Sequence, residues 1–311
     1  MKKTAKARAP AAISSFFEIC DTTPDRKPIV DLQRVGSRGG GFGLEKGVLT
    51  EISVSQARRS HIAVFINGQP APQAKTTQTI VEALLTKAQG AFEVVVDHQI
   101  DVPIGAGFGT SAGGALTAGL ALKSALELPL TYNQIGTAAH IAEIQCQTGL
   151  GTVTPLAIGG DCMLVIEPGA PGIGVIDRIP LSQDYRLVAG VFVPTPKKIV
   201  LESAQKHREV NRYGRKTLDA ILAEPSLENF LECCWQFAQD AGFASDRVKQ
   251  LVQLAMRAGA VGAAQNMIGE AVHAVVLKEN AAVVAEVFKQ VLPKESVLVS
   301  RFDLQGARLV G

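Results

Sequence analysis

The stretch PIGAGFGTSAGG, residues 103–114, contains five glycines and two adjacent hydroxyl residues. Glycine has no Cβ and adopts positive φ readily, so backbone N–H groups in such a stretch can approach an anion closely. The N-terminal end of a helix also favours negative charge. We therefore predict a loop that binds the phosphates of a nucleotide, with Pro103, Gly105, Gly107 and Gly109 in the loop and Thr110, Ser111 and Ala112 at the start of a helix.

The flanking sequence places this loop between a strand and a helix. Residues 92–96 are rich in valine, which is typical of a strand, and residues 115–126 have an apolar helical pattern without proline. The loop lacks the lysine of GxxxxGK[ST], and Thr-Ser follows its glycines where a GxGxxG fingerprint would continue. A glycine-rich turn that only packs a helix against a sheet is the alternative. The Thr-Ser pair at the helix start favours phosphate binding.

This loop resembles the second motif of the GHMP kinases, Pro-x-x-x-Gly-x-Gly-[Ser/Thr]-Ser-Ala. These are small-molecule kinases named for galactose, homoserine, mevalonate and phosphomevalonate. Further segments are similar to one group in this family, the archaeal pantoate kinases, which phosphorylate pantoate on the route to coenzyme A. They follow in the order of the family and comprise residues 9–19, 35–48, 257–272 and 305–310.

The resemblance implies an α+β protein with the GHMP kinase fold. Residues 1–170 would form a ribosomal-S5-like N-terminal domain that binds the nucleotide, and residues 171–311 a ferredoxin-like C-terminal domain. The active site would lie in the cleft between them. ATP and Mg²⁺ are the implied cofactors, a small hydroxylated acid is the implied substrate, and the family suggests a homodimer.

Composition agrees with a globular enzyme. The chain has 311 residues, of which 47% are hydrophobic, and its formal net charge is +2. It contains neither the apolar core of a signal peptide nor a run of about 18 apolar residues, so we expect a soluble, cytoplasmic protein without a membrane partner. Lys2, Lys3, Lys6 and Arg8 cluster at the start. No other basic stripe follows, which favours a solvated terminus over an arm that binds nucleic acid.

The cysteines and histidines do not form a metal-binding pattern. The five cysteines lack C-x-x-C spacing, and no two of the five histidines are spaced as metal ligands. We therefore expect reduced thiols and no transition-metal site. The cysteines are Cys20, Cys146, Cys162, Cys233 and Cys234.

Residue patterns predict the order of the elements. Glycines and prolines between residues 159 and 172 break the pattern, so we place the domain boundary near residue 170. Strands are predicted over residues 11–18, 47–54, 61–66, 185–194, 271–277 and 295–300. Helices are predicted over residues 79–88, 131–147, 199–210, 213–223, 227–242, 245–257 and 281–291, and one more after a turn at residues 259–262.

Glu143 lies among apolar residues on the helix that follows the loop helix. A carboxylate there is either a metal ligand or a solvated surface group, and spacing alone leaves both open. The resemblance favours the metal, because in GHMP kinases a glutamate on this helix joins a loop hydroxyl around magnesium, here that of Ser111 or Thr110. His140 precedes Glu143 by one helical turn and would orient the substrate or this carboxylate. A histidine satisfied in the core is the alternative.

A second glycine-rich segment, GSRGGG at residues 36–41, is predicted to be a tight turn that closes on a small ligand. The planar guanidinium of Arg38 suits capture of a carboxylate, and Ser37 and Gly39 would contact the same ligand. An arginine on an exposed loop is the alternative. Gly262, in the third motif, would allow close approach to the substrate or serve packing alone. Lys197 and Lys198 would reach the cleft or form a solvated pair.

Two positions depart from the pantoate kinase pattern. Ala12 stands where the first motif usually has a histidine, and Thr152 stands where the family has an aspartate, its candidate general base. Threonine does not accept a proton at neutral pH, so we predict phosphoryl transfer without a carboxylate base, with Thr152 orienting the reaction. The homoserine kinases also lack this carboxylate. Two alternatives to a pantoate kinase stay open. One is a GHMP kinase that acts on a different hydroxy acid or an isoprenoid precursor, and the other is a catalytically weak nucleotide-binding protein.

Overall fold

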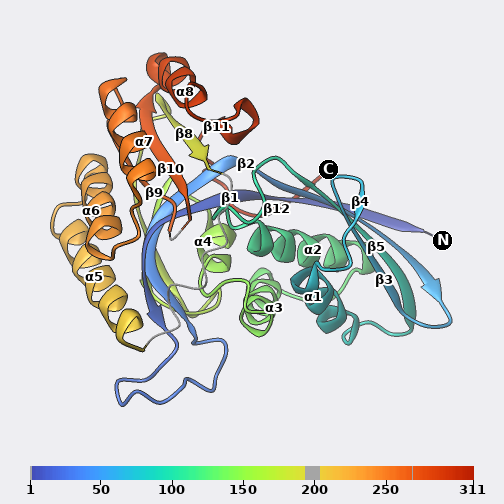
Figure 1. Ribbon diagram of the computed structural model, residues 1–311. Helices are drawn as coiled ribbons and strands as arrows, with labels where there is room; N and C mark the ends of the chain where they lie inside the picture. The colour runs from blue at the N-terminus through green and yellow to red at the C-terminus, as the bar shows by residue number, and fades with distance from the viewer. Residues whose placement is uncertain (1, 193–203, 268) are drawn as a thin grey trace.

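The computed structural model describes residues 2–192, 204–267 and 269–311, which form two sheets (Figure 1). The first sheet has eight strands in the order β12-β1-β2-β5-β3-β4, and β6 joins it by pairing with β2 and β7. Its strands are β1 (Lys3–Cys20), β2 (Gly36–Ala57), β3 (His61–Ile66), β4 (Gln69–Pro70), β5 (Ala91–Ile100), β6 (Cys162–Glu167), β7 (Val175–Ile179) and β12 (Arg308–Val310).

Helices α1 to α3 lie together on one side of this sheet (Figure 1). The helix that follows the glycine loop, α2, is central, since it contacts β1, β2, α1 and α3. Gly119 allows this packing, because a Cβ at that position would lie 2.7 Å from Ile135 and 2.9 Å from Ile80. The helices of this part are α1 (Lys75–Leu85), α2 (Thr110–Leu126), α3 (Tyr132–Gln145) and α4 (Val153–Ile158).

The second sheet has four antiparallel strands in the order β11-β8-β10-β9. Numbered along the chain this order is 4-1-3-2, with helices after the first and third strands, so the predicted ferredoxin-like arrangement is confirmed. Its elements are β8 (Tyr185–Val191), α5 (Ala204–Ala223), α6 (Leu227–Asp240), α7 (Asp246–Arg257), β9 (Gly262–Gln265), β10 (Ala271–Leu277), the short helix η1 (Lys278–Asn280), α8 (Ala281–Lys289), η2 (Lys294–Ser296) and β11 (Val297–Ser300).

The long antiparallel pair β1 and β2 connects the two parts of the molecule (Figure 1). Its aromatic side chains pack against α6, with ring centroids 5.2 Å apart for Phe42 and Phe230 and 5.6 Å apart for Phe17 and Phe237. Edge-to-face aromatic pairs of this kind add to the apolar burial that holds the two parts together. The strand segment that carries these rings also lines the cavity described below.

The glycine-rich segment at residues 36–41 is not a turn, so this prediction was wrong. It lies at the start of β2 and pairs with the end of β1. A Cβ at Gly41 would lie 1.7 Å from the carbonyl oxygen of Ile13, and one at Gly39 would lie 2.4 Å from that of Phe16. Glycine is therefore required here because the backbones of two paired strands approach closely beside a register shift, not because the chain reverses.

Two further predictions were wrong, and three elements of five or six residues were not predicted. The segment after Gly259 is the strand β9 and not a helix, and α5 runs without a break from Ala204 where two helices were expected. Residues 199–203 of the first of these helices and Pro194 lie outside the described residues. The missed elements, β6, β7 and α4, have six residues or fewer, and glycine flanks β6 and the end of α4.

The chain passes from the first sheet to the second between Ile179 and Tyr185. Both β7, which follows residue 170, and β12 at the end of the chain belong to the first sheet. A domain boundary at residue 170 would fall between the paired strands β6 and β7, and it stays a prediction. None of the helices in the described ranges combines the length and apolar character that a bilayer span requires.

Candidate active site

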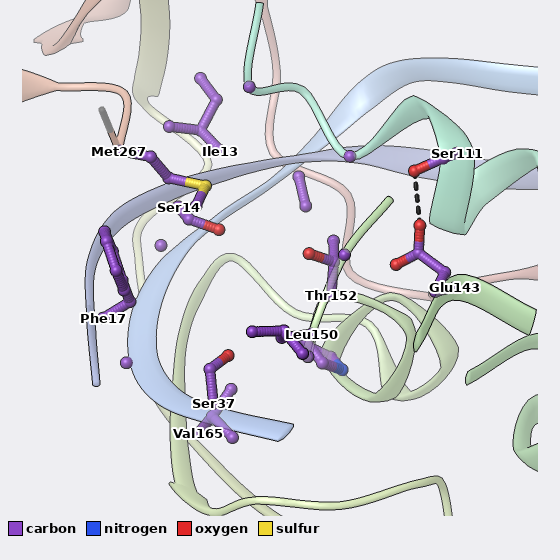
Figure 2. A pocket seen from close by; sticks show the side chains of 18 of the residues that line it. Ile13, Ser14, Phe17, Ser37, Ser111, Glu143, Leu150, Thr152, Val165 and Met267 are labelled. Atoms are coloured by element: carbon purple, nitrogen blue, oxygen red, sulfur yellow. Dashed lines mark hydrogen bonds between the residues drawn. The ribbon is translucent and has the colours of Figure 1, made fainter. Parts of the chain in front are cut away.

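A cavity of about 720 Å³ opens where the glycine loop, the ends of β1 and β2 and the segment after α3 meet (Figure 2). It brings together most of the residues that the sequence singled out. These are Ser37, Arg38, Gly39, Gly105, Gly107, Gly109, Thr110, Ser111, Glu143 and Thr152. Four other predicted site residues do not line it, namely Pro103, Ala112, His140 and Gly262.

The glycine loop has the backbone that an anion site needs. Gly105, Gly107 and Gly109 have φ of +78°, +81° and +62°, a region that residues with a Cβ rarely adopt. Gly109 is the N-cap of α2, and no side chain caps this helix. The first N–H groups of a helix have no partner within it, so those of α2 are available to an anion at the cavity.

Glu143 faces the start of α2 from the neighbouring helix α3. Its Oε1 accepts a hydrogen bond from Ser111 Oγ at 2.5 Å (Figure 2) and another from Thr148 Oγ1 at 3.2 Å. The residue is only 2% exposed. Burial raises the pKa of this carboxyl, and the two hydroxyl groups offset part of the shift. The solvated surface group that spacing left open is therefore excluded.

A carboxylate and a hydroxyl at a helix N-terminus are suitable oxygen ligands for Mg²⁺ bound to a nucleotide. In the described ranges no three His, Cys, Asp or Glu side chains gather as a metal site. Mg²⁺ is typically held by one or two carboxylates and substrate phosphates rather than by a cage of protein ligands. The pair of Ser111 and Glu143 thus fits this ion, and the assignment of Mg²⁺ to them belongs to the proposal below.

Arg38 lines the other end of the cavity and is held by a buried acid. It lies opposite Glu18 in the pairing of β2 with β1, and its Nη2 is 2.5 Å from Glu18 Oε2. Arg215 of α5 binds the second oxygen of Glu18 at 2.7 Å. The side chain of Glu18 is 4% exposed and pairs with both guanidinium groups, one at each of its oxygens.

Helix α5 is placed on β1 by close contacts that the sequence did not reveal. Asn211 accepts a hydrogen bond from the Ile19 N–H and donates one to the Ile19 carbonyl oxygen, both at 2.8 Å. A Cβ at Gly214 would lie 2.1 Å from the carbonyl oxygen of Phe17. Glu18 and Arg215 were missed as site residues because they are far apart in sequence, and only the docking of α5 joins them.

His140 lies in the core and does not reach the cavity. It is 1% exposed, its Nε2 donates a hydrogen bond to the Val35 carbonyl oxygen at 2.9 Å, and burial lowers its pKa. The structure thus favours the core alternative over contact with a substrate. Gly262 also serves packing, since a Cβ there would lie 2.6 Å from Leu231 of α6.

Ala12 and Thr152, the two residues that depart from the pantoate kinase pattern, lie close together beside Gly109. A Cβ at Gly109 would lie 2.8 Å from Thr152 Cγ2 and 3.3 Å from Ala12 Cβ. Both side chains also line the cavity. The chain therefore has two small side chains beside the glycine loop where the family pattern has two ionisable ones.

Other lining residues carried no signal in the sequence. Ser14 and Met267 come from a strand bulge and from the turn before β10, and their place in the cavity depends on the meeting of the two sheets. Lys197 and Lys198 lie outside the described residues. The five cysteines are free thiols, as expected.

Comparison with known proteins agrees with this site. The family model for the GHMP kinases N-terminal domain matches residues 75–160, which contain the glycine loop and Glu143. The fold and the site thus define a member of the GHMP kinases.

Individual relatives show which group of the GHMP kinases this chain resembles. Pantoate kinase from Thermococcus kodakarensis is 32% identical over 281 residues, which is 89% of each chain. Pantoate kinase from Methanocaldococcus jannaschii is 27% identical over 272 residues, covering 87% of this chain and 92% of that protein. A solved structure described as a phosphotransferase related to the CoA biosynthesis pathway is 27% identical, with a TM-score of 0.86 over 99% of this chain and 98% of the other. The chain belongs to the pantoate kinase family.

Proposed function

We propose that this protein transfers the γ-phosphoryl group of ATP to the primary hydroxyl of (R)-pantoate, giving 4-phosphopantoate in a route to coenzyme A. The observation that carries the proposal is one cavity with the glycine loop and the hydrogen-bonded pair of Ser111 and buried Glu143 at one end and Arg38 at the other. The pantoate kinases among its relatives and the phosphotransferase related to the CoA pathway support it.

The nucleotide phosphates would bind to the backbone N–H groups of the glycine loop and the first turn of α2. Ser111 and Glu143 would hold the Mg²⁺ ion, which neutralises phosphate charge as it develops. Burial of Glu143 makes its charged form unfavourable until a cation arrives, so metal binding and ionisation of this carboxyl would be coupled.

The acid would bind at the opposite end, with its carboxylate on Arg38 and a hydroxyl near Ser37. Arg38 keeps its position through Glu18, so its guanidinium is oriented before the acid enters. Orientation of the acceptor hydroxyl towards the γ-phosphate is what phosphoryl transfer chiefly requires. Thr152, beside the loop, would orient the reacting hydroxyl, whose proton would pass to a phosphate oxygen or to water.

The decisive experiment is coupled ADP release with pantoate, homoserine, mevalonate and shikimate, followed by mass spectrometry of the phosphorylated product. Turnover of pantoate alone supports the proposal. Turnover of another acceptor alone supports a GHMP kinase of different specificity, and ATP binding without turnover supports a nucleotide-binding role. We also propose that the protein is cytoplasmic and that it forms a homodimer. Light scattering of the purified chain would test the oligomeric state.

A further inference from the structure

Met267 has an unusual backbone for a residue that lines the cavity. Its φ is +46°, in the left-handed region that residues with a Cβ avoid. Figure 2 shows its side chain beside Ile13 and Ser14, near Phe17 of β1. Strained residues of this kind persist only where the surroundings fix them, and they concentrate at ligand sites.

Backbone hydrogen bonds fix Met267 from two sides. Its N–H donates to the Ser14 carbonyl oxygen at 2.8 Å, which ties the turn before β10 to the bulge in β1. The neighbouring Asn266 N–H donates to the Ala271 carbonyl oxygen at 2.9 Å, which closes the turn itself.

Buried side chains add a second tie between the two sheets. His273 Nδ1 is 2.8 Å from Asn266 Oδ1, and His273 Nε2 is 3.0 Å from Ser15 Oγ. All three residues are at most 1% exposed. Burial lowers the pKa of His273 to about 3, so the ring is neutral and has one donor and one acceptor. It therefore donates from Nδ1 to Asn266 and accepts at Nε2 from the Ser15 hydroxyl.

The position of Met267 relates it to the acid end of the cavity. Phe17, which lies near Met267, is opposite Gly39 in the pairing of β1 with β2, directly next to the pair of Glu18 and Arg38. Met267, Ile13 and Phe17 thus form an apolar wall of the cavity, and its Phe17 end is next to the register position of Arg38. A methionine in such a wall fits closely against irregular apolar groups.

We infer that Met267, held by this network, selects an acceptor with a branched carbon chain over an unbranched one. The inference rests on the proposed function. Pantoate carries two methyl groups on the carbon between its carboxylate end and its primary hydroxyl, and 2,4-dihydroxybutanoate has the same polar groups without these methyls. An apolar wall distinguishes ligands that differ by one methylene by about 10–200-fold.

The test compares kcat/KM for pantoate and for 2,4-dihydroxybutanoate in the wild type and in Met267→Gly, Met267→Ala and Met267→Leu. We expect the wild type to prefer pantoate by at least about tenfold, the lower end for one methylene. Met267→Gly suits the left-handed backbone, so its melting temperature should be retained while the preference approaches unity. Met267→Ala should lose the preference as well, and Met267→Leu should keep most of it.

Met256, an exposed residue of α7, provides the matched control, and Met256→Ala should leave the preference unchanged. Equal losses of kcat/KM for both acids in Met267→Gly and Met267→Ala, with the preference retained, would overturn the inference and leave the proposed function intact. A wild type that phosphorylates pantoate without preferring it would do the same. A wild type that does not phosphorylate pantoate overturns the proposed function, and the inference with it.

Discussion

The carboxylate of Glu143 occupies the space that any side chain at position 149 would need. A Cβ at Gly149 would lie 2.3 Å from Glu143 Oε2 and 3.1 Å from Oε1. The preceding residue, Thr148, donates a hydrogen bond to Oε1. The segment after α3 is thus fitted around this carboxylate, which it holds against Ser111 at the start of α2.

We predict that Gly149→Ala displaces Glu143 from Ser111 and lowers kcat. A displacement of a catalytic group by about 1 Å lowers the reaction rate on the order of 100-fold where the rate depends on positioning. Steady-state kinetics at several Mg²⁺ concentrations would also show weaker apparent metal binding. In a Glu143→Ala background the same substitution should cost little further activity, because the clash is gone. Additive losses would show that Gly149 acts independently of Glu143.

Glu143→Gln should lose activity and gain stability. Turnover should fall by about 100-fold or more, as for removal of a group that stabilises the transition-state charge. The pKa of Glu143 is raised in the folded protein, so its stabilising contribution is present below the unfolded pKa and is lost as pH rises through the folded pKa. Above the folded pKa the ionised carboxylate therefore destabilises the fold, and Gln removes this cost.

Thermal melts from pH 4 to pH 8 without metal check the predicted direction of this pH dependence of stability. The difference in melting temperature between Glu143→Gln and the wild type should grow as pH rises. A variant that is less stable than the wild type at pH 8 would contradict the prediction, and retention of more than half the activity would reassign Glu143.

The raised pKa of Glu143 also predicts how activity depends on pH. Protonation of this carboxyl would remove the proposed metal ligand, so kcat/KM should fall on the acid side with an apparent pKa above the ordinary glutamate range. A bound cation favours the ionised form, so raising the Mg²⁺ concentration should move this limb to lower pH. An acid limb that does not respond to Mg²⁺ would assign it to another group.

Arg38→Ala should raise KM for the acid far more than KM for ATP. Arg215→Ala is the matched control, since both arginines bind Glu18 but only Arg38 lines the cavity. We expect KM for the acid to stay near the wild-type value in Arg215→Ala. An equal rise in both variants would show that the effect comes from leaving Glu18 without a partner.

Local features of the site could be predicted from the sequence, and features that depend on strand register could not. The glycine loop and the start of a helix near residue 131 are determined by neighbouring residues, and the structure has both, with Thr131 as the N-cap of α3. Gly39 and Gly41 were misread because the lack of a Cβ serves a tight turn and the close approach of two paired strands equally well. The ion pairs around Glu18 were missed because Arg38 joins Glu18 through strand pairing, and Arg215 joins Glu18 from a helix about 200 residues away in the chain.

The last prediction concerns Thr152, whose methyl group lies against Gly109 beside Ala12. Because no carboxylate base occupies this position, we expect Thr152→Val to lower kcat by less than about tenfold, well below the loss of 10²–10⁴ that removal of a general base causes. Thr152→Ser, which keeps the hydroxyl, is the control for lost packing against Gly109. Thr152→Asp should raise kcat by supplying a base beside the phosphate loop. A loss of more than about 100-fold in Thr152→Val, with ATP affinity and the Thr152→Ser variant intact, would make the Thr152 hydroxyl a direct participant in proton transfer.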